Sequence, residues 1–188
     1  MTEISEKLLL CKNTLIEMLT DREYIIDTRL LENSAELKML VHHKKTNAQL
    51  LVHYCDEAKV GIKTLKMLIE SFEKQDISHI LLICKEALSP ASSRLIEEYN
   101  SKFTIEVFKE RELLFNVTKH ELVPKHILLS ENEKEIFLKN RKLKEQELPK
   151  ILKIDPVARY YGAKRGQVFE ILRKSKSAGT ALYYRVVI

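Results

Sequence analysis

The stretch Asp155-Pro-Val-Ala-Arg-Tyr-Tyr-Gly-Ala-Lys-Arg-Gly166 lies at the centre of the part of the chain that decides its organisation. This last third opens at His120-Glu-Leu-Val-Pro-Lys-His126 and holds three of the four glycines and three of the four prolines. Glycine and proline accept or fix backbone conformations that other residues avoid. We therefore expect Asp155-Pro156 to fix a turn, and Gly162 and Gly166 to take a positive φ or to allow a close approach.

Charge divides the chain into two parts. Residues 119–188 carry 16 Lys and Arg against 8 Asp and Glu, a net charge of +8, whereas residues 1–118 carry 16 against 19, a net charge of −3. The overall charge of +5 therefore comes from a basic module joined to a mildly acidic one. At 188 residues the chain can bury two small cores. We predict two domains, 1–118 and 119–188.

The bulk composition excludes several classes of protein. A content of 45% hydrophobic and 31% charged residues is typical of a soluble globular protein. No apolar run approaches the ~20 residues that span a bilayer, and Met1–Lys7 lacks the order of a signal peptide. The three cysteines have no paired spacing, so we expect reduced thiols in a cytosolic or nuclear protein that does not contact a membrane.

The first domain is predicted to alternate strands and helices. Apolar residues at helical spacing indicate an amphipathic helix over 3–19, and Asn33 followed by Glu36 is a capping-box pattern for a second helix to about Val41. Beyond these we expect strands over Gln49–Cys55, His79–Cys84 and Phe103–Phe108, and helices over Ile62–Phe72, Pro90–Tyr99 and Glu110–Leu114. Alternation of this kind implies a small, mainly parallel sheet flanked by helices.

The second domain is predicted to be a smaller α+β unit. Ser130 with Glu133 forms a capping box that begins a helix through about Asn140. Val168–Arg173 and Ala181–Ile188 have the composition of two strands. The predicted fold class is thus α+β: an N-terminal α/β domain with a small sheet flanked by helices, followed by a small C-terminal α+β domain with a short sheet and short helices.

Two catalytic patterns fail on their spacing. A zinc-protease helix needs two histidines one turn apart, whereas His120 and His126 are six residues apart with Pro124 between them. Asp56-Glu57-Ala58-Lys59 has the form of a metal-dependent nuclease motif, but such a site needs a further carboxylate, for which Asp27 is the only upstream Asp within reach. A polar turn is the better interpretation. We expect no catalytic residue, no resident metal and no cofactor.

The basic tail allows more than one interpretation. Between Asp155 and Ile188 stand seven basic residues and two acidic ones, which is typical of a solvated face, of a nucleic-acid contact or of a contact with an acidic protein. Tyr160 and Tyr161 lie beside Arg159, where their rings could stack on bases. Tyrosine and arginine are equally typical of the centres of protein–protein interfaces.

Longer motifs carry a family resemblance. Those in the last third are His120-Glu-Leu-Val-Pro-Lys-His126, Leu143-Lys-Glu-Gln-Glu-Leu-Pro149, Asp155-Pro-Val-Ala-Arg-Tyr-Tyr-Gly162 and Lys164-Arg-Gly-Gln-Val168. They closely resemble the shared fifth subunit of the eukaryotic nuclear RNA polymerases and its shorter archaeal counterpart. Asp21-Arg-Glu-Tyr-Ile-Ile26, Val60-Gly-Ile-Lys-Thr-Leu-Lys66 and Thr104-Ile-Glu-Val-Phe108 are similar to the family's eukaryotic N-terminal domain, which the archaeal form lacks. The connection from Leu31 to Gln49 is shorter than is usual in the family.

The resemblance implies a non-catalytic subunit common to polymerases I, II and III in the nucleus. The C-terminal domain would dock on the largest subunit and assist assembly, and the N-terminal domain would form part of the lower jaw near downstream DNA. The implied partners are the largest subunit, other core subunits, transcription factors and, weakly, downstream duplex DNA. A free-standing basic nucleic-acid-binding regulator is the alternative, and it would bind DNA directly with a steep dependence on salt.

The candidate site residues form two sets. Candidates for contact with the largest subunit are His120, Pro124, His126, Asp155, Pro156, Arg159, Tyr160, Gly162, Arg165 and Gly166. Candidates for contact with downstream DNA are Ser89, Pro90, Ala91 and Arg94, since Ser89-Pro90 begins a predicted helix whose free amides could face a phosphate. Ordinary turn geometry and ordinary helix capping are the alternatives for the two sets.

Overall fold

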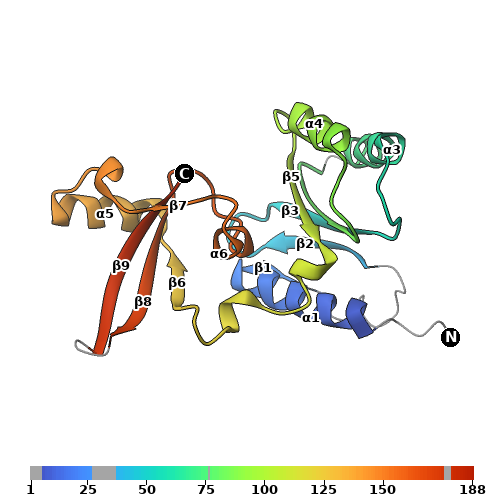
Figure 1. Cartoon of the computed structure of the whole chain (residues 1–188). Coiled ribbons are helices and arrows are strands. Elements are labelled where there is room, and N and C mark those ends of the chain that lie inside the picture. Colours follow the sequence, from blue (N-terminus) through green and yellow to red (C-terminus); the bar gives the residue numbers. More distant parts are fainter. Residues whose placement is uncertain (1–5, 27–36, 76, 176–178) are drawn as a thin grey trace. The chain divides into compact units, whose positions relative to one another are not determined.

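The computed structural model describes residues 6–26, 37–75, 77–175 and 179–188. The chain forms two compact units, Met1–Phe115 and Asn116–Ile188, and each unit combines helices with its own sheet (Figure 1). The predicted α+β class is confirmed. The two units meet three residues before the boundary that the sequence indicated. No helix in the described ranges is long and apolar enough to cross a membrane.

The N-terminal unit is built on a five-stranded mixed sheet. Its strands, in order across the sheet, are β1 (Tyr24–Ile25), β2 (Lys38–His43), β3 (Gln49–Cys55), β4 (His79–Cys84) and β5 (Thr104–Lys109). Strands β3, β4 and β5 are parallel, as predicted, whereas β1, β2 and β3 pair antiparallel. The sheet is therefore parallel on one side and antiparallel on the other.

The predicted helix ending near Val41 is wrong where the structure describes it. Lys38–His43 is strand β2, and the capping-box residues Asn33 and Glu36 lie outside the described residues. Met39 and Val41 are buried while Lys38 and Leu40 are exposed. This alternation has the period of a strand, and pairing with β3 overrides the local capping signal.

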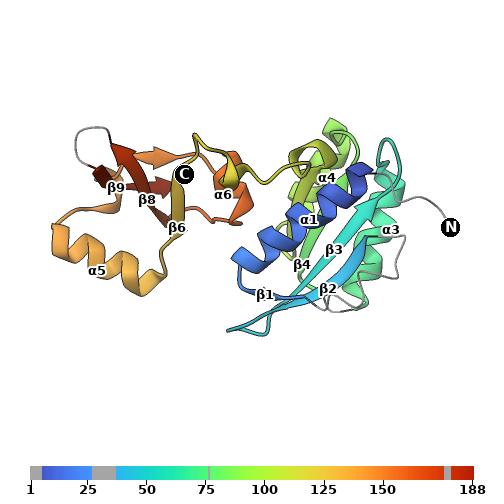
Figure 2. The same cartoon turned by 90° about the horizontal axis from the view of Figure 1, so that it is seen from below.

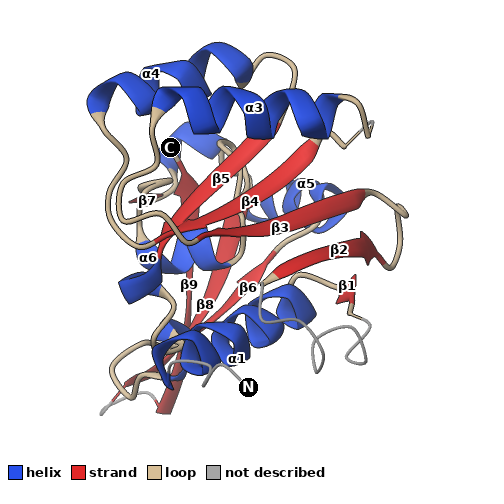
Figure 3. Cartoon of the chain, turned by 90° about the vertical axis from the view of Figure 1, so that its right-hand side faces the viewer, coloured by secondary structure: helices blue, strands red, loops and turns tan. Residues whose placement is uncertain are grey.

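Helices cover both faces of this sheet, as Figures 2 and 3 show. Helix α1 (Glu6–Asp21) lies on one face, and α3 (Ile62–Glu73) and α4 (Pro90–Tyr99) lie on the other. Strand β4 is buried on both faces: Ile80, Leu82 and Cys84 pack in the cluster that includes α3 and α4, and the intervening residues point to the opposite side. The predicted bounds of β3, β4, α3 and α4 are confirmed within a residue.

A buried ion pair joins α1 to the sheet. Arg22, directly after α1, donates two hydrogen bonds to the Glu106 carboxylate, with N–O distances of 3.0 and 2.8 Å. His79 Nε2 donates to the same carboxylate at 2.8 Å, so its Nδ1 can accept from the Tyr24 hydroxyl at 3.3 Å. Burial alone raises the pKa of Glu106, but the hydrogen bond from His79 and the charge of Arg22 lower it to about 2.

The C-terminal unit has a four-stranded sheet in the order β6-β8-β9-β7. Its elements are β6 (Lys125–Leu128), α5 (Glu131–Arg141), β7 (Lys150–Ile151), α6 (Pro156–Tyr160), β8 (Val168–Ser175) and β9 (Gly179–Val187). The predictions of α5, β8 and β9 are confirmed, whereas β6, β7 and α6 were not predicted. The two faces carry separate small cores, one with α6 residues such as Ala158 and one with Phe137 and Leu138 of α5.

Three short 3-10 helices complete the chain: η1 (Glu110–Glu112), η2 (Val117–Lys119) and η3 (Glu145–Glu147). The first lies within the predicted helical turn Glu110–Leu114. The cysteines Cys11, Cys55 and Cys84 are all free and buried, which agrees with the reduced thiols expected from the sequence.

We predict that Glu106→Gln lowers the free energy of unfolding by roughly 3 kcal/mol at pH 7, because Arg22, whose side chain is 5% exposed, loses its carboxylate partner. Since the pKa of Glu106 is depressed in the folded chain, this contribution is complete above the unfolded pKa of about 4.3 and disappears as the pH falls through about 2. Urea unfolding at pH 7 and at pH 3 measures both effects.

Glu98→Gln is the matched control, because Glu98 is an exposed carboxylate on α4 and its loss should change stability by less than about 0.5 kcal/mol. Equal stability of the Glu106→Gln and Glu98→Gln variants at pH 7 would contradict the role given to this ion pair.

Candidate partner and nucleic-acid interfaces

The Asp155–Gly162 stretch forms a short helix with a defined end on each side. Asp155 Oδ1 accepts a hydrogen bond from the Val157 N–H at 2.9 Å, and Pro156 occupies the first helical position. At the other end Gly162 has φ +60°, the Gly162 N–H donates to the Arg159 carbonyl, and the Ala163 N–H donates to the Ala158 carbonyl. This is a Schellman ending, so the expected turn is a capped one-turn helix.

Gly166 links the loop after α6 to two other elements. Its φ is +88°, and its N–H donates to the Val187 carbonyl at 2.9 Å. Its own carbonyl accepts from Lys134 Nζ at 2.7 Å, and the same ammonium lies 2.8 Å from Glu145 Oε2. The expected positive φ at Gly162 and Gly166 is confirmed. Lys134, only 13% exposed, was missed because nothing in the sequence separates it from the other charges of α5.

Two of the candidate interface residues turn inward. Tyr160 is 3% exposed, and its hydroxyl accepts from Asn116 Nδ2 at 2.9 Å, so its ring cannot stack on a base. His126 is half-buried, contacts the edge of Phe169, and donates from Nδ1 to the Pro124 carbonyl at 2.7 Å. Burial lowers the pKa of His126 and favours the neutral ring. Both side chains therefore support the frame of the unit.

The other candidates lie at or near the surface. His120, Pro156 and Arg165 are exposed, whereas Pro124, Asp155, Arg159, Gly162 and Gly166 are of intermediate exposure. The segments Asp155–Gly166 and His120–His126 approach each other through Phe169, whose ring contacts both His126 and Tyr161, with centroid distances of 5.7 Å in each case.

An exposed apolar surface on the same unit was missed by the sequence reasoning. Leu152 is 54% exposed, Ile154 is 76% exposed and Ile188 is 39% exposed. The Lys153 N–H donates to the Ile188 carbonyl, and the Ile188 N–H donates to the Ile151 carbonyl, so the C-terminal residue lies alongside this segment. We call Leu152, Ile154 and Ile188 the Ile154 patch. The sequence alone could not show that these side chains stay outside the core.

The DNA candidates lie at the beginning of α4. Ser89 Oγ accepts from the Ser92 N–H at 3.1 Å, and Pro90 has no N–H to offer. Ordinary capping therefore holds, and the Ala91 N–H is the first-turn amide that this cap leaves open. Ser89, Pro90, Ala91 and Arg94 are all at or near the surface, and Arg94 follows Ala91 at the i+3 spacing of one helix face.

The rejected nuclease-like motif lies at the surface. Asp56 pairs with Lys85 at 2.7 Å, and Glu57 accepts from Thr64 Oγ1 at 3.2 Å. Asp27 lies outside the described residues. Among residues 6–26, 37–75, 77–175 and 179–188, no group of three or more His, Cys, Asp or Glu side chains is placed to hold a metal ion.

Comparison with known proteins covers almost the whole chain. Residues 115–187 match the family described as RNA polymerase Rpb5, C-terminal domain. The chain is 34% identical to the Caenorhabditis elegans protein named DNA-directed RNA polymerases I, II, and III subunit RPABC1, over 94% of this chain and 93% of that one. The Dictyostelium discoideum protein of the same name is 36% identical, over 97% and 98% of the two chains.

The chain belongs to the RPABC1 (Rpb5) family of shared RNA polymerase subunits. The family resemblance seen in the motifs is thereby confirmed, and with it an accessory, non-catalytic polymerase subunit. The matched range of the Rpb5 C-terminal domain, 115–187, coincides with the C-terminal unit within a residue at each end. This unit is thus a family module with its own core.

We predict that Gly166→Ala destabilises the chain by about 1–2 kcal/mol, because an alanine at φ +88° is strained even though its Cβ would meet only ordinary contacts. Gly61→Ser is the control, since Gly61 has φ −76° and open space around a built Cβ. Calorimetric unfolding of both variants checks this. A Gly166→Ala variant as stable as Gly61→Ser would show that the left-handed conformation at Gly166 is not required.

Proposed function

We propose that this Rpb5-family subunit docks on the largest subunit of the nuclear RNA polymerases through its C-terminal unit, and that its N-terminal unit forms part of the lower jaw near downstream DNA. The proposed partners are the largest subunit, neighbouring core subunits and transcription factors, and the proposed location is the nucleus. The support comes from surface chemistry that differs between the two units.

The Ile154 patch is the observation that carries the docking proposal. Its three aliphatic side chains are exposed to solvent, and they belong to a module with a net charge of +8. Burying one such side chain fully contributes about 1.5–3 kcal/mol, so their exposure favours a partner that covers them. The surrounding positive charge suits a partner surface that is acidic around an apolar centre.

Hydrogen bonds order the loops of the unit that carries the Ile154 patch. Both ends of α6 are capped by hydrogen bonds. The loop after α6 is held at Gly166, which has a left-handed conformation and whose carbonyl accepts a hydrogen bond from Lys134. A surface that is already ordered loses little conformational entropy on docking, which increases the affinity for a given contact area. The inward candidates Tyr160 and His126 contribute to docking through this frame.

The jaw proposal rests on the beginning of α4. A helix N-terminus attracts anions, and here the Ala91 N–H and the exposed Arg94 guanidinium lie on one face. Glu97 and Glu98 at the other end of the helix and the net charge of −3 over residues 1–118 oppose a longer contact with DNA. We therefore propose a short contact with one or two phosphates, made within the assembled polymerase.

We predict that Ile154→Asp reduces the recovery of the largest subunit with the tagged chain at least about tenfold under stringent salt, because a carboxylate would then have to be buried in the interface. Met67→Asp is the matched control: Met67 is 54% exposed, but it lies on α3 of the N-terminal unit. Equal recovery with both variants would contradict docking through the Ile154 patch.

Deletion of residues 119–188 should abolish incorporation, whereas deletion of 1–118 should leave some docking. The free-standing regulator would be favoured by a different result: the wild-type chain is recovered from nuclear extract with nucleic acid but without large polymerase subunits, and its affinity for DNA falls steeply with salt.

We predict that Arg94→Ala lowers crosslinking to downstream DNA in the assembled polymerase and reduces the salt dependence of downstream-duplex affinity by about one phosphate contact, with the rate of nucleotide addition unchanged. Lys102→Ala is the control, because it removes one exposed cation just beyond the opposite end of α4. Unchanged crosslinking in the Arg94→Ala enzyme would count against the jaw contact.

A further inference from the structure

Strand β9 is paired along only part of one edge. It runs over nine residues, Gly179–Val187, and β8 pairs with it along this whole length. On the other side β7 pairs only with Val186 and Val187. From Gly179 to Arg185 no strand of the described chain lies against that edge, which is the outer edge of the β8–β9 hairpin in Figure 1.

The hydrogen bonds at the end of β9 show which backbone groups point outward. The Val186 N–H donates to the Pro149 carbonyl, on the β7 side, whereas the Val187 N–H donates to the Gln167 carbonyl, on the β8 side. Because the direction of these groups alternates along a strand, Thr180, Leu182 and Tyr184 direct their N–H and C=O groups to the open edge.

Sheet edges of this kind usually carry protection against pairing with other chains. The common devices are proline, a bulge or a charged side chain directed inward. Thr180–Arg185 has no proline, its pairing with β8 is continuous, and its one charge, on Arg185, is exposed. Leu182 is 53% exposed and Tyr183 is 47% exposed. The edge therefore offers both hydrogen-bonding groups and apolar surface.

We propose that the open edge of β9 between Thr180 and Tyr184 is a strand-addition site that takes an extended segment of the largest polymerase subunit; this rests on the docking function proposed above. The added strand would bond to the outward N–H and C=O groups, as in other cases of strand addition to a sheet edge. The edge is continuous with the Ile154 patch, because β9 leads directly into Ile188.

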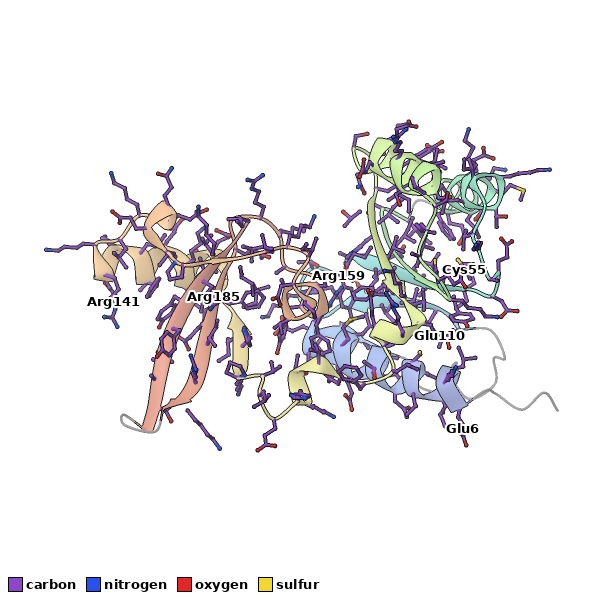
Figure 4. All side chains as sticks on the ribbon, viewed as in Figure 1. Glu6, Cys55, Glu110, Arg141, Arg159 and Arg185 are labelled. Atoms are coloured by element: carbon purple, nitrogen blue, oxygen red, sulfur yellow. The ribbon has the colours of Figure 1, made fainter. Side chains whose placement is uncertain are left out.

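The side chains on the two faces of the β8–β9 hairpin specify the chemistry of that segment. Register places Arg185, Tyr183 and Arg173 on one face of the hairpin, and Arg185 is labelled in Figure 4. The opposite face presents Leu182 and Leu172, which are register partners. An added strand that alternates acidic with aliphatic side chains would place an acid beside Arg185 and an aliphatic group beside Leu182, which are its neighbours on β9.

A second copy of this chain is a poorer occupant. Two β9 edges could pair antiparallel, but each copy would bring a module with a net charge of +8. Repulsion between two such modules disfavours self-association at moderate ionic strength. The charge of the module instead selects an acidic partner segment.

The first test compares Leu182→Pro with Leu182→Ala in the full chain. Proline removes the outward N–H but no hydrogen bond to β8, so the hairpin is retained, whereas alanine keeps the N–H and removes only the side chain. We expect Leu182→Pro to reduce co-purification of the largest subunit at least about tenfold below Leu182→Ala. Equal recovery with both variants would overturn the strand-addition site.

The second test is residue-resolved amide hydrogen exchange in the free chain and in assembled polymerase. In the free chain the amides of Thr180, Leu182 and Tyr184 should exchange fast, and those of Tyr183 and Arg185, which face β8, should exchange slowly. Assembly should slow the three outward amides at least about tenfold.

The outcomes separate this inference from the docking proposal. Outward amides that stay fast in a polymerase that contains the chain would overturn strand addition and leave docking intact. Failure of the wild-type chain to recover the largest subunit would overturn the docking function itself. Slow outward amides in the free chain, together with a dimer in sedimentation, would overturn the assignment of the occupant and favour self-pairing.

Discussion

The C-terminal unit depends on the antiparallel pairing of β8 with β9. This ladder runs from Val168 opposite Val186 to Ser175 opposite Gly179. Both small cores lie on it, since Phe169 and Ile171 face α6 while Val168 and Val186 face α5. The outer strands β6 and β7 have partners only because this ladder exists. A unit of 73 residues can bury only a small core, so its fold depends on this one hairpin.

Hydrogen bonds from side chains hold the loops around this hairpin. Lys134 contacts the Gly166 carbonyl, Asn116 contacts the Tyr160 hydroxyl, and Asp155 caps α6. These contacts join segments that no strand pairing reaches. In the N-terminal unit the same role falls to Glu106, which holds Arg22 and His79 at the edge where α1 ends. In both units a few buried or half-buried polar groups position elements that apolar packing alone would leave loosely placed.

Elements with a strong local signal could be predicted from the sequence. The apolar run His79–Cys84 and the Ser89-Pro90 start of α4 appear in the structure with the predicted bounds. Elements with weak or competing sequence patterns were not predicted. Strand β2 was missed because a capping pattern before it indicated a helix, whereas its strand conformation depends on pairing with β3. Strands β6 and β7 were missed because four and two residues are too few to show a period. Positive φ at Gly162 and Gly166 could be predicted because glycine has a direct conformational reason to occupy such positions.

The burial of the candidate site residues was also beyond what the sequence could predict. A sequence motif does not show which of its side chains are buried and which are exposed. The candidate set for contact with the largest subunit therefore included both the buried Tyr160 and the exposed Arg165. It also passed over Leu152, Ile154 and Leu182, because an aliphatic residue in a sequence is expected inside. Exposure depends on which strand edge is left open and on which segment lies beside the last residue. Both are properties of tertiary pairing: Leu182 is exposed on a strand whose outer edge is unpaired there, and Leu152 and Ile154 are exposed in the segment that bonds to Ile188.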